Sequence, residues 1–119
     1  MFDNTLMLID PSANVTATVT GSAVEFPGED MRELYVGIFV PSKAGTNPKI
    51  VATIQESDNG SSGWTTIASF ADITDKGMYV AHPRGKKKYR RAVLTVSGTD
   101  PDFGKVKVGV LTSGMYTNW

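Results

Sequence analysis

A polar loop between two β-rich runs is the feature of this sequence that most constrains its fold. Residues 49–56 and 64–70 are the two runs, and the loop between them, Ser57 to Gly63, contains Asn59-Gly60. Asn and Gly both tolerate positive φ, so this pair marks a reversal between antiparallel strands. The stretch therefore predicts a β-hairpin, and we interpret its polar loop as a plain turn.

The same alternation of strand and turn signals runs from one end of the chain to the other. Period-two or β-branched runs occupy residues 5–9, 14–20, 23–26, 34–40, 49–56, 64–70, 77–82, 89–97 and 105–112. No window has a helical period, and the segments 41–48 and 98–104, which contain Pro and Gly, are expected to be loops. A chain of 119 residues has the usual size of one domain.

We therefore expect residues 1–119 to form a single all-β domain. The favoured architecture is a two-sheet antiparallel jelly-roll sandwich of about eight strands. An immunoglobulin-like sandwich is the alternative, although the Cys…Trp…Cys pattern of antibody domains is absent.

The alternation within single runs predicts which side chains face the core. Ile50, Ala52 and Ile54 are expected to point inward, as are the valines at 106, 108 and 110. Residues 34–40 are apolar on both faces, which indicates a central strand covered on both sides or a strand that faces a partner.

Few residue types here could carry out catalysis or hold a metal. The sequence has no cysteine and a single histidine, His82, so a zinc site or a disulfide framework is not expected. The aspartates at 58, 72, 75, 100 and 102 lie in turns with Gly and Pro, where Asp is a favoured turn residue. We expect no catalytic residue, no metal and no cofactor.

Neither a membrane span nor a leader is expected. No apolar run approaches the ~20 residues that cross a bilayer. Residues 1–10 lack the basic region of a signal peptide, so a product that is made in the cytoplasm, or assembled there into something larger, is expected.

Charge is distributed unevenly along the chain. Residues 1–60 hold eight acids and three bases, whereas residues 61–119 hold four acids and nine bases. The basic segment, residues 84–91, contains Arg84, Lys86, Lys87, Lys88, Arg90 and Arg91. It could bind an acidic protein surface, or it could be a solvated loop whose lysines discourage edge-to-edge aggregation. A nucleic-acid partner is not expected, because the net charge is zero and Tyr89 is the one aromatic residue in the segment.

The chain ends and the segment 41–48 add further candidates for partner contact. Free termini are usually polar, whereas here both ends carry large apolar side chains that must pack on the core or on a neighbour. The candidate contact residues are Phe2, Lys43, Arg84, Lys86, Lys87, Lys88, Arg90, Tyr116 and Trp119.

Three stretches, in this order, resemble the jelly-roll capsid cement (decoration) proteins of tailed bacteriophages. The opening MFDNTLMLIDPSANVTATVTGS resembles their N-terminal strand pair. The central IVATIQESDNG, followed by Trp64, resembles their middle hairpin, and YRRAVLTVSG followed by GKVKV resembles their final strands. The order and spacing of these stretches carry the resemblance, which covers nearly the whole chain.

The resemblance implies a non-enzymatic protein on the outer surface of an icosahedral head. Such a protein would be made in the host cytoplasm, join the virion and bridge neighbouring major capsid subunits. It implies a homo-oligomer, for which a dimer is favoured and a trimer is the alternative. A carbohydrate-binding sandwich is the alternative function, with Tyr35, Tyr79 or Trp64 as stacking platforms unless these rings pack in the core.

Overall fold

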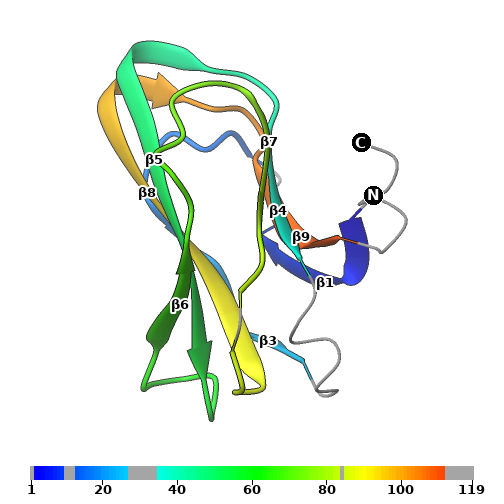
Figure 1. Cartoon of the computed structure of the whole chain (residues 1–119). Coiled ribbons are helices and arrows are strands. Elements are labelled where there is room, and N and C mark those ends of the chain that lie inside the picture. The colour runs from blue at the N-terminus through cyan, green and yellow to red at the C-terminus, as the bar shows by residue number, and fades with distance from the viewer. Residues whose placement is uncertain (1, 10–12, 27–34, 84, 112–119) are drawn as a thin grey trace.

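Two antiparallel β-sheets pack together in the computed structural model, which describes residues 2–9, 13–26, 35–83 and 85–111 (Figure 1). The strands are β1 (Phe2–Ile9), β2 (Val19–Thr20), β3 (Val24–Glu25), β4 (Val36–Val40), β5 (Ala44–Ser57), β6 (Thr65–Ser69), β7 (Gly77–Ala81), β8 (Tyr89–Asp102) and β9 (Lys107–Leu111). The described residues contain no helix. The prediction of an all-β sandwich is therefore confirmed.

The order of the strands is that of a jelly roll. One sheet has the order β1-β9-β4-β7, and the other has the order β2-β8-β5-β6 with β3 also paired to β8. Because β2 and β3 pair along the same neighbour, they act as one interrupted strand, which leaves four strand positions in each sheet. Every connection except β2–β3 and β5–β6 crosses between the sheets, so the chain wraps around one shared core.

The core lies between the sheets and is built by the predicted alternation. Ile50, Ala52 and Ile54 are buried, while the residues between them are half-exposed. The valines at 106, 108 and 110 are likewise buried from the opposite sheet. Each such aliphatic side chain stabilises the fold by about 1.5–3 kcal/mol when it leaves water. As expected for residues 34–40, β4 is a central strand, between β9 and β7.

The two longest strands, β5 and β8, form a curved ribbon (Figure 1). The prediction that 41–48 and 98–104 are loops is wrong for most of both segments, because the two strands extend into them. Ala44 pairs with Asp102 and Thr46 with Thr99, so both strands continue into these segments. The pairing tolerates Pro48 because the register shifts between Thr46 and Lys49, where no regular ladder bond is needed.

The prediction of a strand over 14–20 is correct only at its end, because β2 covers Val19–Thr20 alone. The preceding residues pair with a loop instead of a strand. Val15 is buried, its N–H donates to the Gly104 carbonyl at 2.8 Å, and its own carbonyl accepts from the Phe103 N–H at 3.1 Å.

Candidate functional site

The loop of the β5–β6 hairpin uses its polar atoms to hold itself together. The Asn59 Oδ1 atom accepts hydrogen bonds from the N–H groups of Ser61 and Ser62 at 2.9 and 3.0 Å. The Ser57 hydroxyl accepts from the Gly60 N–H at 3.2 Å and donates to the Ser62 carbonyl at 2.5 Å. These oxygens are committed to the turn, which supports its interpretation as a structural element and not as a ligand site.

The basic segment 84–91 is anchored to the body of the protein by an acid. The carboxylate of Glu56, at the end of β5, accepts hydrogen bonds from the backbone N–H groups of Lys86 and Lys87 at 2.9 and 3.0 Å. Glu56 is only 9% exposed, so this charge lies mostly out of water. A buried carboxylate that receives backbone donors fixes the path of the chain that leads into β8.

Several side chains of the basic segment are engaged within the protein. Lys87 pairs with Asp58 at 3.5 Å, and Lys88 pairs with Glu25 at 3.8 Å. Lys86 and Lys88 are exposed and Lys87 is half-buried. The lysines therefore remain accessible at the surface, and the ion pairs of Lys87 and Lys88 are exposed pairs that contribute little free energy.

The buried position of Arg90 contradicts the prediction that this residue contacts a partner. Its side chain is 0% exposed, with the guanidinium 5.2 Å from the centre of the Phe26 ring. Its register partner across the ribbon is Glu56. The alternation within β8 turns Arg90 inward, because its neighbour Arg91 is the residue that faces out.

Arg91 forms a surface cluster that sequence reasoning missed. Its guanidinium lies 4.3 Å from the centre of the Trp64 ring, and its Nε donates to the Gln55 side chain at 2.8 Å. Gln55 and Arg91 are register partners in the pairing of β5 with β8. The sequence alone does not indicate this register, so it could not predict the pair.

An apolar patch lies on the outer face of the β1-β9-β4-β7 sheet. Within the described part of the chain, the exposed large hydrophobic side chains are Tyr35 (39%), Phe39 (42%) and Val80 (42%). Val80 is the register partner of Gly37, which lies midway between Tyr35 and Phe39 along the chain. The three side chains therefore lie on one face as diagonal neighbours, in a patch that the apolar outer positions of 34–40 had indicated.

The apolar patch has a stacked ring pair at its edge and a covered glycine, Gly37, at its centre. His82, which follows β7, stacks on Tyr35 with 4.5 Å between ring centres. A Cβ atom at Gly37 would lie 2.8 Å from the Met78 side chain and 2.9 Å from that of Leu111. Because Gly37 has no side chain, the Met78 and Leu111 side chains can lie over this part of the sheet.

The remaining candidate contacts are dispersed. Phe2 begins β1 as the register partner of Leu111. Lys43 lies directly before β5, at the end of the ribbon farthest from the basic segment. Arg84, Tyr116 and Trp119 lie outside the described residues. The predicted contacts therefore do not form one surface in the part of the chain that the structure describes.

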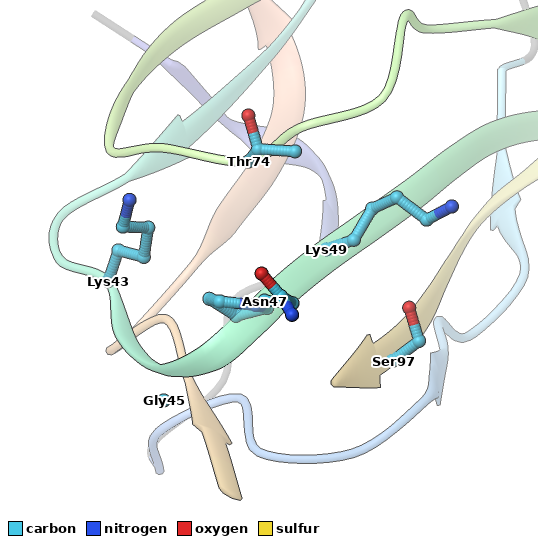
Figure 2. A pocket seen from close by; sticks show the side chains of 7 residues that line it. Lys43, Gly45, Asn47, Lys49, Thr74 and Ser97 are labelled. Carbon is cyan, nitrogen blue, oxygen red and sulfur yellow. The ribbon is translucent and has the colours of Figure 1, made fainter. Parts of the chain in front are cut away.

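A polar groove of about 590 Å³ lies where β5 begins (Figure 2). It is lined by Lys43, Gly45, Asn47, Pro48, Lys49, Thr74 and Ser97. These residues come from β5 and the residue before it, from the segment between β6 and β7, and from β8, so no contiguous motif in the sequence marks the groove.

Across residues 2–9, 13–26, 35–83 and 85–111, three or more His, Asp or Glu side chains never gather in a group that could hold a metal ion. The same residues include no helix long and apolar enough to cross a membrane.

In the residues that the structure describes, the fold is an all-β sandwich that carries an apolar patch on an outer face and a polar groove at the start of β5. Searches against protein-family models and against curated proteins found no match for this chain.

Proposed function

We propose that the protein is a non-enzymatic capsid decoration protein that binds the outside of a tailed-phage head and holds neighbouring major capsid subunits together. The observation that carries the proposal is the apolar patch. Its three side chains, Tyr35, Phe39 and Val80, are exposed on one face of one sheet. Contiguous exposed apolar groups are typical of surfaces that dock another protein.

The architecture around the apolar patch suits a protein that connects others. The patch stands on β4 and β7, whose inner side chains belong to the core, so its geometry is fixed by packing. A rigid docking face loses little entropy when it binds. Each contact can then be weak, because a capsid lattice presents many copies and the contacts act together.

The order of the sequence motifs, which resembles that of phage cement proteins, supports the same proposal. It adds the expectations of a homo-oligomer, with a dimer ahead of a trimer, and of a place on the outer surface of the virion. The apolar patch is available both for contact between copies of this chain and for contact with the capsid. Light scattering on the purified chain would distinguish the two oligomers by mass.

The geometry gives less support to carbohydrate binding. Arg91 covers the Trp64 ring, and the Tyr79 ring packs against the core while its hydroxyl donates to the Asp75 carbonyl at 2.7 Å. Tyr35 stacks on His82. All three proposed platforms are thus engaged with other groups of the protein, and a sugar ring needs an open aromatic face.

Co-sedimentation with purified heads of the phage that encodes this chain tests the proposed function. The variant Phe39→Lys/Val80→Lys replaces two of the three side chains of the apolar patch, and Thr65→Lys/Thr95→Lys adds the same charge at exposed positions of the other sheet. We expect the patch variant to lose about tenfold or more in binding, as for a central hot spot, and the control to bind like the wild type. Equal binding by both variants, or no binding by the wild type, would contradict the proposal.

A further inference from the structure

The polar groove owes its shape to irregular pairing at the start of β5. The register between β5 and β8 shifts between Ala44 and Thr46, and again between Thr46 and Lys49. Gly45 and Asn47 have positive φ values of 109° and 50° in this stretch. Such bulges bend a strand and re-aim its side chains, which separates Lys43, Asn47 and Lys49 along the floor of the groove.

A second segment forms the wall of the groove and is fixed in place by backbone hydrogen bonds. Ile73 pairs with Ile50, and each N–H donates to the other's carbonyl at 2.9 Å. This bridge sets Thr74 beside the floor. It also places Asp72 at 3.7 Å from the Lys49 ammonium and Asp75 at 4.0 Å from that of Lys43.

The two ion pairs at the rim orient the lysines without using up their charge. Both aspartates are mostly exposed, and neither pair is closer than 3.7 Å. Exposed pairs of this kind contribute little free energy, so a better placed carboxylate can replace or join the aspartate. Among the described residues that line the groove itself, none is acidic, and Asn47, Thr74 and Ser97 add neutral hydrogen-bond donors.

The arrangement of the lysines selects the shape of the ligand. Figure 2 shows Lys43 and Lys49 at opposite ends of the groove, with the Asn47 side chain between them. Because the two ammonium groups point in different directions, the arrangement favours a ligand with separated negative charges over a single phosphate or sulfate ion. Carboxylates spaced along an extended chain are such a ligand, since alternate side chains of a strand lie on the same side.

We propose that the groove binds an extended acidic segment of a protein partner, with one carboxylate at Lys43 and another at Lys49. The proposal rests on the docking function above, for which it names the chemistry of a second contact. Charge complementarity of this kind sets the register of a partner and the rate of its association more than the total affinity.

Amide NMR of the ¹⁵N-labelled full chain, titrated with a capped hexaglutamate peptide, tests the groove. We expect the signals of Asn47, Thr74 and Ser97 to shift and the shifts to vanish at about 1 M salt, where charges are screened beyond ~3 Å. Lys43→Gln/Lys49→Gln should weaken binding about tenfold, since each exposed pair contributes a factor of up to about five. Both lysines are exposed, so the variant keeps the fold.

The matched control is Lys86→Gln/Lys88→Gln, which removes the same charge at the other end of the ribbon. It should bind the peptide like the wild type, and capped hexaglutamine should give no shifts. An equal loss in the control variant, no shifts with hexaglutamate, or equal affinity for inorganic phosphate would each overturn the proposal. The peptide assay needs no capsid, so unchanged peptide affinity in Lys43→Gln/Lys49→Gln, with wild-type head binding intact, would refute the groove alone. Peptide binding without head binding would refute only the proposed function.

Discussion

The two ends of the β5–β8 ribbon hold their lysines in different surroundings. At the end near Ser57 and Tyr89, the basic segment is dense in the sequence, and the buried Glu56 fixes its backbone while Lys87 and Lys88 pair with Asp58 and Glu25. At the other end, Lys43 and Lys49 are unremarkable in the sequence and also form exposed ion pairs, with Asp75 and Asp72, but they line an open groove.

The density of charge along a chain therefore does not measure the charge that the folded protein offers to a partner. In a strand that enters a sheet, alternate residues face inward, so a basic run is divided between the core and the surface. At a bulged strand, in contrast, side chains from distant segments meet around an opening. The following predictions test this contrast at each end.

The largest effect is expected at the end with the basic segment. Glu56→Ala removes the acceptor of two backbone N–H groups beside the buried Arg90 side chain. Loss of one member of a buried charged cluster costs about 3–5 kcal/mol, which urea denaturation would measure. Glu25→Gln, at an exposed ion pair, is the control and should change stability by less than about 0.5 kcal/mol. A small effect of Glu56→Ala would show that the segment needs no anchor.

At the groove end, a backbone contact should be the most sensitive feature. A Cβ atom on Gly45, where φ is 109°, would lie 2.6 Å from the Asp100 carbonyl oxygen and 2.8 Å from that of Thr99. We expect Gly45→Ala to destabilise the fold by about 3 kcal/mol, through strain and a forced shift of the ribbon. Gly63→Ala, where φ is also positive but a Cβ meets no atom within 4 Å, should cost about 1 kcal/mol. Equal thermal midpoints for both variants would contradict the tight approach of the strands.

A smaller effect is expected for the guanidinium that covers Trp64. Arg91→Lys keeps the charge but loses the planar group, which lies 4.3 Å from the ring centre, and the hydrogen bond from Nε to Gln55. We expect a loss of about 1 kcal/mol in unfolding free energy together with a change in tryptophan fluorescence. Stability and fluorescence that both match the wild type would argue against the stacked arrangement.

The smallest effects should come from the exposed lysines of the basic segment. Lys87→Gln and Lys88→Gln each break one surface pair, at 3.5 and 3.8 Å. Each should change stability by no more than about 0.5 kcal/mol, and less at high salt, as measured by chemical denaturation. A loss above 2 kcal/mol from either would mean that these pairs are structural after all.

The sequence was a reliable guide wherever one residue's neighbours determine its role. The alternation at Ile50, Ala52 and Ile54 identified the inner face of β5, and Asn59-Gly60 identified the hairpin turn. The alternation within residues 64–70 does not show which side chains face inward, because the β5–β6 pairing contains a bulge. The pairing of β5 with β6 shifts between Ile54 and Gln55, a displacement that local alternation does not reveal.

The surfaces were harder to predict, because they depend on which distant segments pair. Arg90 and Arg91 are adjacent in the same basic run, and only the register of β8 decides that the first is buried and that the second, which is half-buried, faces outward. Val80 joins Phe39 in the apolar patch only because β7 pairs with β4. Lys49 lines the groove together with Thr74 because a single backbone bridge, Ile50–Ile73, brings the two segments together.

The most direct test of the proposed docking function is a cryo-electron microscopy reconstruction of phage heads saturated with this protein. We predict density for the sandwich on the outer surface, with Phe39 and Val80 buried against major capsid subunits. A reconstruction in which the apolar patch faces solvent, or in which saturated heads carry no added density, would contradict the account.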